Sequence, residues 1–240
     1  MLYTSINNSR IKEINQLKQK KFRDKHNLFL IEGEHLLKEA YSAGCLKEMF
    51  ILEGIDFKLD VKTNYINKKI VNYLTEVERP SGIFGVCQIP NSIIKGGKIL
   101  VLDGIQDPGN MGTIIRSAVA FNVDTIIISY KCTDPYGSKV VRATQGMIFS
   151  SNIIKVDLKE TIKELKKNYK IYVTKVDGGN SLKNVTKEEK FVIIMGNEGN
   201  GVSEEIRYLA DEYLYIPMNE KCESLNVGVA TSIILYEFGG

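Results

Sequence analysis

The stretch that decides the fold lies close to the C-terminus and reads EKCESLNVGVATSIILYEF over residues 220–238. Its apolar side chains recur at the spacing of one helix face, at Leu225, Val229, Ile233 and Tyr236. This spacing predicts a helix with that face turned to the core. Three short polar side chains stand where a helix start presents free N–H groups, namely Glu223, Ser224 and Asn226. Taken by itself, the segment favours an ordinary helix that Ser224 caps, with Asn226 incidental.

The composition is that of an ordinary soluble globular protein. The chain has 240 residues, of which 43% are hydrophobic and 25% charged. This length can hold a small domain and a larger one. No apolar run approaches membrane-spanning length, and the N-terminus lacks a hydrophobic signal core. We therefore expect a cytoplasmic protein that has no membrane partner.

The cysteines and histidines exclude several kinds of site. The cysteines are scattered and form no Cys-x-x-Cys pair, so the sequence predicts neither a metal site nor a disulfide framework. The two histidines, His26 and His35, both lie near the N-terminus. Any acid–base chemistry in the C-terminal two-thirds must therefore proceed without histidine, which excludes a Ser-His-Asp triad there.

Positive charge is concentrated at the N-terminus. Residues 1–25 hold seven basic and two acidic side chains, a net charge of +5, whereas the whole chain carries only +3. A basic N-terminal helix is compatible with nucleic-acid contact. A solvated helix face explains the same charges, and charge alone slightly favours that explanation.

The first 90 residues predict a small α/β domain. We expect strands at residues 29–31, 49–52 and 83–87, a helix at 35–43, and a basic helix that begins near residue 8 or 9. Pro90, Gly96 and Gly97 then lie between two apolar runs. We place a linker at residues 91–98, between this domain and a second one over residues 99–240.

The pattern from residue 99 onward predicts a parallel sheet with helices on both faces. Strands are expected at 99–102, 125–129, 152–156, 171–176, 191–195 and 213–216. Helices are expected at 113–121, 138–147, 159–167 and 203–209, followed by the C-terminal one. Strands that alternate with helices, several of them continuously apolar, are typical of such a domain. Ligands bind at the carboxyl ends of the strands in these sheets.

Three polar loops follow predicted strands and form the candidate site. They are DGIQDPGNMG at residues 103–112, GNEGNG at 196–201, and the segment that runs from Pro217 into the stretch quoted above. Glycine in such loops lets the backbone approach a ligand closely. Neither glycine loop spells Gly-x-Gly-x-x-Gly, and no Gly-Lys-Ser/Thr follows. A dinucleotide site and a phosphate-binding P-loop are therefore both disfavoured.

Together the loops resemble the signatures of the SpoU family of RNA ribose 2′-O-methyltransferases, within the SPOUT superfamily. The resemblance rests on LDGIQDPGNMGTIIRSA (102–118), IMGNEGNGVS (194–203), IPM (216–218) and ESLNVGVA (223–230). The first ninety or so residues resemble the family's L30e-like substrate-binding domain through FLIEGE (29–34) and GIFGV (82–86). The resemblance covers nearly the whole chain, although Asn122 and Glu220 stand where relatives often have glycine.

The resemblance implies a cofactor, a topology and an assembly. It implies S-adenosylmethionine bound in a deep C-terminal trefoil knot, and a homodimer whose active site draws on both subunits. Topology rules by themselves predict an open doubly wound sheet without a knot. By resemblance, Arg116 is the leading catalytic residue, joined by Asn110, Glu198, Ser224 and Asn226. The implied cofactor-binding positions are Met195, Gly196, Asn197, Gly199, Ile216, Met218, Ser224 and Leu225.

The catalytic candidates also have ordinary structural explanations. A lone arginine usually lies on an exposed helix face, Asn110 suits a turn before a helix, and Glu198 suits the start of the helix near Ser203. Plain core packing explains the apolar cofactor candidates almost as well. Within the resemblance, we expect Arg116 to bind a phosphate near the target ribose and to lower the pKa of its 2′-hydroxyl. This role is preferred to that of a base because a guanidinium is very hard to deprotonate.

The resemblance thus implies an S-adenosylmethionine-dependent RNA 2′-O-ribose methyltransferase. It also favours ribosomal RNA as the substrate, because relatives that act on ribosomal RNA commonly carry the extra N-terminal domain. Transfer RNA is the nearest alternative, a non-catalytic RNA-binding protein is a second, and a nucleotide-dependent oxidoreductase is a third. DNA is not expected, since the 2′-hydroxyl distinguishes RNA from DNA. For any single lysine a solvated surface position is the simpler explanation, but the candidate RNA contacts are Arg10, Lys20, Lys21, Arg23, Lys139 and Arg142.

Overall fold

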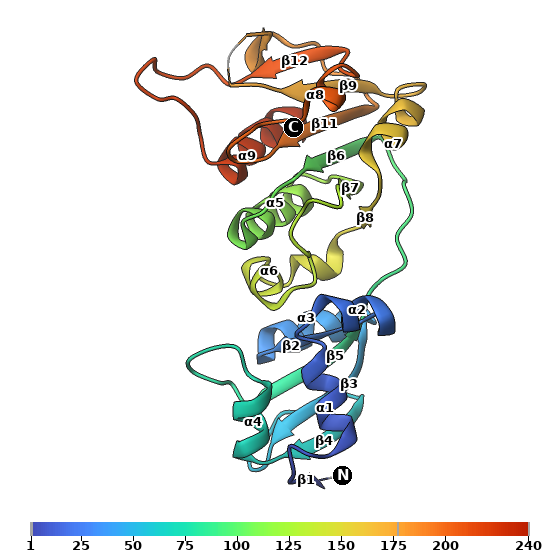
Figure 1. Cartoon of the computed structure of the whole chain (residues 1–240), viewed down its shortest axis with the longest axis vertical. Helices are drawn as coiled ribbons and strands as arrows, with labels where there is room; N and C mark the ends of the chain where they lie inside the picture. Colours follow the sequence, from blue (N-terminus) through green and yellow to red (C-terminus); the bar gives the residue numbers. More distant parts are fainter. Residues whose placement is uncertain (1, 177, 240) are drawn as a thin grey trace. The chain divides into compact units, whose positions relative to one another are not determined.

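The computed structural model describes residues 2–176 and 178–239, and the chain forms two compact units (Figure 1). The N-terminal unit contains residues 1–91 and 134–150, and the C-terminal unit contains residues 92–133 and 151–240. The chain passes from the N-terminal to the C-terminal unit between residues 91 and 92. Residues 134–150 lie within the predicted C-terminal domain in sequence, yet they belong to the N-terminal unit.

The N-terminal unit is built on a five-stranded mixed sheet with the strand order β1-β4-β3-β5-β2. Strand β4 pairs in parallel with β1 and β3, whereas β5 pairs antiparallel with β2 and β3. The strands are β1 (Leu2–Tyr3), β2 (Leu28–Glu32), β3 (Leu46–Leu52), β4 (Lys62–Ile66) and β5 (Ile83–Gln88). The helices are α1 (Ser9–Gln16), α2 (Lys20–His26), α3 (Glu34–Ser42), α4 (Lys68–Leu74), α6 (Ser138–Ala143) and the 3-10 helix η1 (Met147–Ser150).

One core of the N-terminal unit lies between its sheet and helices α1 and α4. Its buried side chains are Ile11, Ile14, Leu17, Phe50, Ile66, Ile70, Val71, Leu74, Phe84 and Val86. Asn8 and Asn67 start the two helices, because their side chains accept backbone hydrogen bonds at 2.9 and 3.1 Å. The predicted basic N-terminal helix is in fact two helices, α1 and α2. The second ends at Asn27, which adopts a left-handed conformation with φ of 54°.

The C-terminal unit is built on a seven-stranded sheet with the order β10-β12-β9-β11-β6-β7-β8, in which all neighbouring strands among the described residues are parallel. The strands are β6 (Lys98–Asp103), β7 (Thr125–Ile128), β8 (Ile153–Lys155), β9 (Lys170–Thr174), β10 (Asn180–Ser181), β11 (Phe191–Gly196) and β12 (Glu212–Tyr215). The helices are α5 (Pro108–Ala120), α7 (Leu158–Leu165), η2 (Leu182–Asn184), α8 (Glu204–Arg207) and α9 (Val227–Gly239).

Helices cover both faces of this sheet, as the sequence predicts. On one face, α7 and α8 pack against a cluster that includes Ile171 and Val173 of β9. On the other face, Phe238 of α9 contacts Tyr172 and Phe191, with ring centroids 5.1 and 5.0 Å apart. Successive side chains of a strand point to opposite faces, so β9 has apolar residues on both sides. Helix α9 packs along α5 on the second face (Figure 1).

The buried face of α9 differs from the predicted one. Val229, Ile233 and Tyr236 are 46%, 37% and 66% exposed, and the prediction that they face the core is wrong. Nearly every residue of this helix is apolar or small, so the sequence does not distinguish one face of the helix from another. Which face is buried depends on how the helix packs against the rest of the unit. A Cβ at Gly228 would lie 3.0 Å from Cγ2 of Thr113, so this glycine permits the close approach of α9 to α5. The residues that are buried are Gly228, Thr231, Ile234, Leu235 and Phe238.

Helix α5 begins at Pro108, whereas the sequence predicts a start at Thr113. The side chain of Asp107 accepts a hydrogen bond of 2.8 Å from the backbone N–H of Asn110, and Pro108 occupies the first helical position. Both features are ordinary signals of a helix start, but the glycines that follow favour a loop. Asn110 therefore stands in the first turn of a helix.

Candidate functional site

The three loops predicted as the site surround one cavity of about 630 Å³ in the C-terminal unit. They follow β6, β11 and β12, at the carboxyl ends of parallel strands, where α/β sheets bind ligands. The volume is within the usual range of small-molecule sites. All the predicted cofactor positions line this cavity, namely Met195, Gly196, Asn197, Gly199, Ile216, Met218, Ser224 and Leu225.

A chain of side-chain hydrogen bonds joins the three loops. The amide of Asn226 donates to Oδ1 of Asn110 at 2.8 Å, and the amide of Asn110 donates to Oε1 of Glu198 at 3.0 Å. Oδ1 of Asn226 accepts from the backbone N–H groups of Gly228 at 2.9 Å and Val229 at 3.3 Å. Each of the two amides uses both its donor and its acceptor, so the orientations of Asn110 and Asn226 are fixed.

Glu198 connects the second loop to the first. Its carboxylate also accepts hydrogen bonds from the backbone N–H groups of Gln106 at 3.4 Å and Asp107 at 3.2 Å. Burial by itself raises the pKa of Glu198. The hydrogen bonds that its carboxylate accepts lower the pKa by more, and they come from Asn110, from its own backbone, and from the backbones of Asp107 and Gln106. The pKa therefore lies below its ordinary value. Glu198 is a charged hydrogen-bond acceptor at neutral pH.

The loop over residues 197–201 is a tight turn closed by its own backbone. Asn197 and Gly201 exchange backbone hydrogen bonds of 3.0 and 2.9 Å, and Oδ1 of Asn197 accepts from the N–H of Gly199 at 3.0 Å. A Cβ at Gly196 would lie 2.1 Å from the backbone of Gly201 and Val202. The loop itself therefore requires glycine at 196, whereas a Cβ at Gly199 would meet nothing closer than 3.7 Å.

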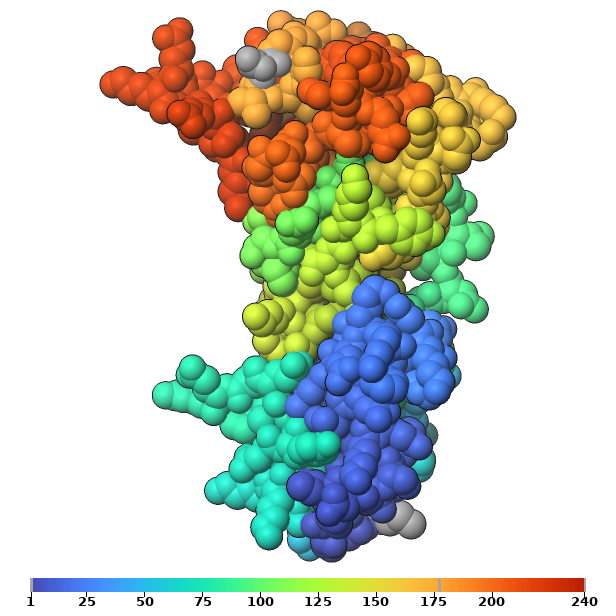
Figure 2. Space-filling model, in the orientation of Figure 1, coloured from blue at the N-terminus to red at the C-terminus, as the bar shows by residue number. Residues whose placement is uncertain are grey.

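The segment between β12 and α9 carries Ser224 and Leu225 to the cavity. Residues 219–224 are exposed, and this segment projects from the surface of the unit (Figure 2). Ser224 lines the cavity, while Asn226 accepts the first N–H groups of α9. The simpler explanation, in which Ser224 is the cap and Asn226 is incidental, is therefore wrong. From the sequence, Glu198 is also a candidate to stabilise the start of the helix near Ser203. In the structure, Asp103 has this position, because its carboxylate accepts a hydrogen bond of 2.9 Å from the backbone N–H of Ser203.

Arg116 lies outside the cavity of its own chain. It is exposed on α5, and it does not line the cavity although Asn110 on the same helix does. Their separation in sequence places the two side chains about 120° apart around the helix axis. Within the part of the chain that the structure describes, the guanidinium of Arg116 forms no hydrogen bond or ion pair. It can therefore bind a group from another molecule.

The cavity has a fourth wall that the sequence motifs miss. Thr174, Lys175 and Val176 line it from the carboxyl end of β9. Strand β9 pairs with both β11 and β12, which carry two of the predicted loops. The sequence predicts a strand at 171–176, so the rule that ligands bind at carboxyl strand ends could have identified these residues.

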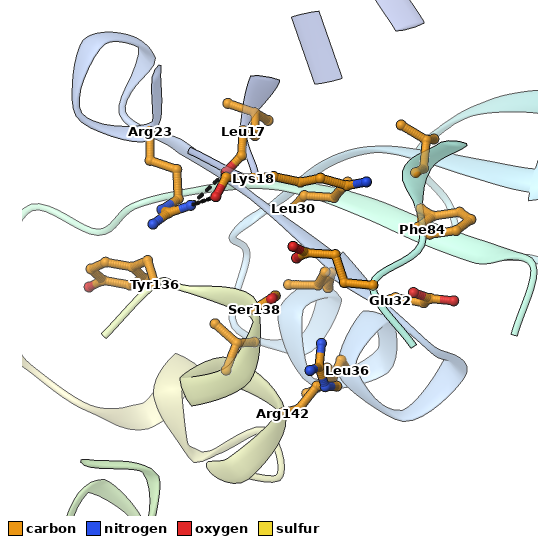
Figure 3. A pocket seen from close by; sticks show the side chains of 14 residues that line it. Leu17, Lys18, Arg23, Leu30, Glu32, Leu36, Phe84, Tyr136, Ser138 and Arg142 are labelled. Carbon is orange, nitrogen blue, oxygen red and sulfur yellow. Dashed lines mark hydrogen bonds between the residues drawn. The ribbon is translucent and has the colours of Figure 1, made fainter. Parts of the chain in front are cut away.

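Arg23, a predicted RNA contact, is an internal residue of the N-terminal unit. It is 6% exposed and donates to the carbonyl oxygens of Leu17 at 2.8 Å and Lys18 at 2.7 Å (Figure 3). It also pairs with Asp134 at 2.6 Å. Together with Tyr136 it borders a cavity of about 20 Å³, which has room for about one water molecule. The guanidinium of Arg23 is therefore occupied by contacts within the protein.

The other predicted RNA contacts keep at least part of their charge at the surface. Arg10 and Lys20 are partly exposed and form ion pairs, and the ammonium of Lys21 lies 4.8 Å from the centroid of an aromatic ring. Lys139 is exposed on α6, and Arg142 is half-buried and lines the small cavity (Figure 3). All five belong to the N-terminal unit, because α6 is part of it.

The described residues contain neither a metal-binding cluster nor a membrane-spanning helix. Among residues 2–176 and 178–239, no three histidine, cysteine, aspartate or glutamate side chains gather as a metal site would require. The thiols of Cys45, Cys87, Cys132 and Cys222 are free. None of the described helices is long and apolar enough to cross a lipid bilayer.

Known proteins and protein families match most of the length of the chain. Residues 97–236 match the SpoU rRNA Methylase family, and residues 8–85 match the MRM3-like substrate binding domain. The 23S rRNA (guanosine(2553)-2′-O)-methyltransferase RlmP of Bacillus subtilis is 35% identical over an alignment of 243 residues, which covers 98% of both chains.

Solved structures extend the similarity to the fold. The AdoMet-bound rRNA methyltransferase of Sinorhizobium meliloti is 28% identical, with a TM-score of 0.87 over 99% of this chain and 96% of that chain. The SpoU methyltransferase AviRb of Streptomyces viridochromogenes, in complex with AdoMet, is 23% identical, with a TM-score of 0.85 over 96% of this chain and 97% of that chain. At that identity the second comparison concerns the fold alone.

Proposed function

Because the chain belongs to the SpoU rRNA methylase family, we propose that it transfers the methyl group of S-adenosylmethionine to a ribose 2′-hydroxyl of 23S ribosomal RNA. The family confirms the activity and the cofactor that the sequence predicts. The choice of 23S rRNA rests on the Bacillus subtilis relative, which covers 98% of both chains. That relative acts on a guanosine, and we propose a guanosine as the target here. Transfer RNA, a non-catalytic RNA-binding role and an oxidoreductase activity are correspondingly disfavoured.

The observation that carries this proposal is the cavity at the carboxyl ends of β6, β11 and β12. The loops that carry the family motifs surround it, and Asn110, Glu198 and Asn226 join those loops by direct hydrogen bonds. A network in which each side chain is held by the next is suited to positioning reactants, and positioning supplies much of the catalysis in a methyl transfer.

The residues of the cavity fit S-adenosylmethionine. Ile216, Met218 and Leu225 offer apolar surface to the adenosine part, and Glu198 and Glu223 offer carboxylates to its positively charged sulfonium and ammonium groups. The bound cofactor supplies an activated methyl group. The protein must then hold the RNA hydroxyl in line with that methyl group and favour the loss of its proton.

We assign these tasks to different side chains. Asn110 and Asn226 orient the reacting groups at the cavity, and Glu198 holds Asn110 in place. Arg116 binds a phosphate beside the target ribose and lowers the pKa of the 2′-hydroxyl electrostatically. The geometry that supports this role is an exposed guanidinium without a partner among the described residues.

Arg116 is proposed to serve the cavity of a second copy of the chain. It lies on α5, which packs along α9, and α9 exposes Val229, Ile233 and Tyr236. An exposed apolar stripe of this kind is typical of a protein interface. We propose a homodimer in which this stripe forms the contact, so that Arg116 of each subunit completes the active site of the other.

The N-terminal unit, the chain topology of the C-terminal unit and the cellular location of the protein are also covered by the resemblance to the family. We propose that the N-terminal unit has an L30e-like fold and binds RNA through Arg10, Lys20, Lys21, Lys139 and Arg142, and its match to a substrate-binding domain supports this role. We also propose a trefoil knot in the C-terminal unit. Its support is that the late strand β11 lies between β6 and β9, and that α9 packs beside the early helix α5. A cytoplasmic location accords with an RNA substrate.

The test is to incubate the purified protein with labelled S-adenosylmethionine and with rRNA, ribosomal particles or tRNA in separate reactions. Alkali-resistant sites in the RNA then report 2′-O-methylation. We expect one methylated guanosine in 23S rRNA, and no label with a variant that lacks the Asn110 side chain. Labelling of tRNA alone would support the proposed methyl transfer but contradict the proposal that 23S rRNA is the substrate. Absence of cofactor binding would favour the non-catalytic RNA-binding role.

A further inference from the structure

The turn that follows β7 presents an aromatic ring and a cation at the edge of the sheet that holds the cofactor cavity. Tyr130 is 68% exposed, and Lys131 beside it is also exposed. Within the part of the chain that the structure describes, the hydroxyl of Tyr130 and the ammonium of Lys131 form no hydrogen bond or ion pair. Both side chains are therefore free to contact another molecule.

The backbone of this turn is held by β6 and by the residue after it. The hydroxyl oxygen of Ser129 accepts a hydrogen bond of 3.0 Å from the backbone N–H of Gly104. The N–H of Ser129 donates to the carbonyl of Leu102 at 3.0 Å, and the thiol of Cys132 donates to the same carbonyl at 3.3 Å. The two side chains between Ser129 and Cys132 thus stand on a fixed piece of backbone, which lowers the entropy that they lose on binding.

The turn lies close to the wall of the cofactor cavity. Strands β6, β7 and β11 are parallel, so their carboxyl ends share one edge of the sheet. A Cβ at Gly104 would lie 3.9 Å from Cβ of Lys131 and 3.7 Å from Cβ of Asn197, which lines the cavity. The amide of Asn197 also donates to the carbonyl of Gly104 at 2.8 Å. An RNA strand continues on both sides of its target nucleotide, so a strand that brings a ribose to the cavity also passes over neighbouring parts of this edge.

The surroundings of Tyr130 and Lys131 do not form a site for a small ligand. The two residues border a hollow of about 110 Å³ at the carboxyl ends of β6, β7 and β8. This volume is well below the usual range of small-molecule sites. Lys159, another cation that borders it, is paired with Glu205 at 3.4 Å. A larger molecule that lies across the edge of the sheet fits the two exposed side chains better.

Resting on the proposed function, we propose that the ring of Tyr130 stacks on a base of the RNA close to the target nucleotide, and that Lys131 binds a phosphate of the same strand. Unpaired RNA is commonly recognised by an aromatic side chain on which a base stacks, together with a cation that contacts the backbone. The turn after β7 supplies one of each, beside the cavity and on a fixed backbone. It thus adds an RNA contact on the C-terminal unit to those proposed for the N-terminal unit.

The test of Tyr130 measures affinity for 23S rRNA, free and in ribosomal particles, and the kinetics of methyl transfer with each. Tyr130→Ala should weaken RNA binding and raise the KM for RNA roughly tenfold. Its affinity for S-adenosylmethionine should not change, because Tyr130 does not line the cofactor cavity. Tyr130→Phe keeps the ring and should behave as the wild type does. Tyr130→Leu keeps apolar surface without a ring and should lose most of the affinity.

A second measurement tests the phosphate contact of Lys131. Lys131→Met should reduce the slope of log affinity for RNA against log salt concentration by about 0.7 to 1, as for the loss of one phosphate contact. Lys183 provides the control, because it is exposed on η2, which follows the strand at the opposite end of the sheet. Tyr208 is 78% exposed and borders neither hollow, so Tyr208→Ala is the control for Tyr130→Ala.

The possible results distinguish this inference from the proposed function. Wild-type RNA affinity and KM in Tyr130→Ala would overturn the inference, while methyl transfer by the wild type would still support the proposed function. Wild-type behaviour of Tyr130→Leu would contradict stacking, and an equal loss in Tyr208→Ala would show a general effect of the surface. If the wild-type protein methylated 23S rRNA in neither form, the proposed function itself would fail.

Discussion

The side-chain amide of Asn226 donates a hydrogen bond of 2.8 Å to the side-chain oxygen of Asn110, which lies 116 positions earlier in the chain. The side-chain amide of Asn110 in turn donates a hydrogen bond of 3.0 Å to the carboxylate of Glu198. The starts of α5 and α9 and the loop after β11 are therefore one hydrogen-bonded unit at the cavity. Because each member holds the next, we expect substitutions within this set to be non-additive.

The two functions of Asn226 can be separated by substitution. Asn226→Ala removes the oxygen that caps α9 and the donor to Asn110, so we expect the free energy of unfolding to fall by about 1 kcal/mol and methyl transfer to fall at least roughly tenfold. Asn226→Asp keeps the capping oxygen but cannot donate to Asn110. It should retain stability in urea unfolding and still lose methyl transfer. Wild-type turnover by the aspartate variant would show that the bond to Asn110 is dispensable.

The low pKa of Glu198 predicts a pH-dependent contribution to stability. Its folded-state pKa lies below the ordinary value of 4.5, so its hydrogen bonds stabilise the folded state fully above pH 4.5. That contribution is lost as the pH falls through the folded-state pKa. Glu198→Gln should therefore be less stable than the wild type at neutral pH, and the difference in unfolding free energy should narrow on acidification below 4.5.

A matched carboxylate provides the control for this pH profile. Glu220 is exposed on the segment that precedes α9. The difference between Glu220→Gln and the wild type should stay small and flat over the same range. A flat profile for Glu198→Gln as well would mean that its hydrogen bonds do not favour the folded state.

Arg116 should affect turnover without affecting cofactor affinity. It lies outside the cavity, so Arg116→Ala should bind S-adenosylmethionine as the wild type does and lose about a hundredfold in methyl transfer. Arg116→Lys should recover little, because a lysine cannot form the paired hydrogen bonds of a guanidinium. Arg207, an exposed arginine on α8, provides the control, since Arg207→Ala should leave both quantities unchanged.

The proposed exchange of Arg116 between subunits can be tested by mixing two inactive variants. A mixed dimer of Arg116→Ala and Asn110→Ala subunits would contain one site with an intact Asn110 and a partner's intact Arg116. We expect activity to return when the two variants are co-refolded. Lack of any recovery in verified mixed dimers would place Arg116 and the cavity in the same subunit.

The ion pair between Arg23 and Asp134 should be important for the N-terminal unit. Both side chains are largely buried, so Arg23→Met leaves an unpaired carboxylate and should lower the unfolding free energy by about 3 kcal/mol. The exposed pair of Lys20 and Asp24 gives the comparison, since Lys20→Met should cost no more than about 0.5 kcal/mol. Urea unfolding followed by circular dichroism measures the unfolding free energy of both variants. Equal stability of the two variants would contradict a stabilising role for the ion pair between Arg23 and Asp134.

Much of the C-terminal unit follows from local sequence. Continuously apolar runs of strand length, each followed by a polar loop, determine a parallel sheet and place the loops at one edge. The motifs at 102–118, 194–203 and 216–230 therefore identify residues that do surround one cavity. The residues at the end of β9 carry no motif, and for this reason Lys175 is found only once β9 is seen between β11 and β12.

The parts that could not be predicted depend on packing between distant segments. Helix α9 is apolar nearly all round, so the exposure of Val229 and Tyr236 follows from its contact with α5. Arg23 has the sequence context of a surface residue, and its burial follows from Asp134, which is 111 positions away. Local patterns contain no information about such partners.

The contacts made by residues 134–150 have a consequence for synthesis on the ribosome. Phe29 of β2 packs against Tyr136 and Phe149, with ring centroids 5.0 and 6.0 Å apart. A nascent chain that ends near residue 91 therefore has all the strands of the N-terminal sheet but lacks the partners of Phe29. Translation must add the intervening strands β6 and β7 first, a delay on the order of several seconds. During that interval the apolar surface around Phe29 is open to chaperones, so the N-terminal unit is completed late although it is synthesised first.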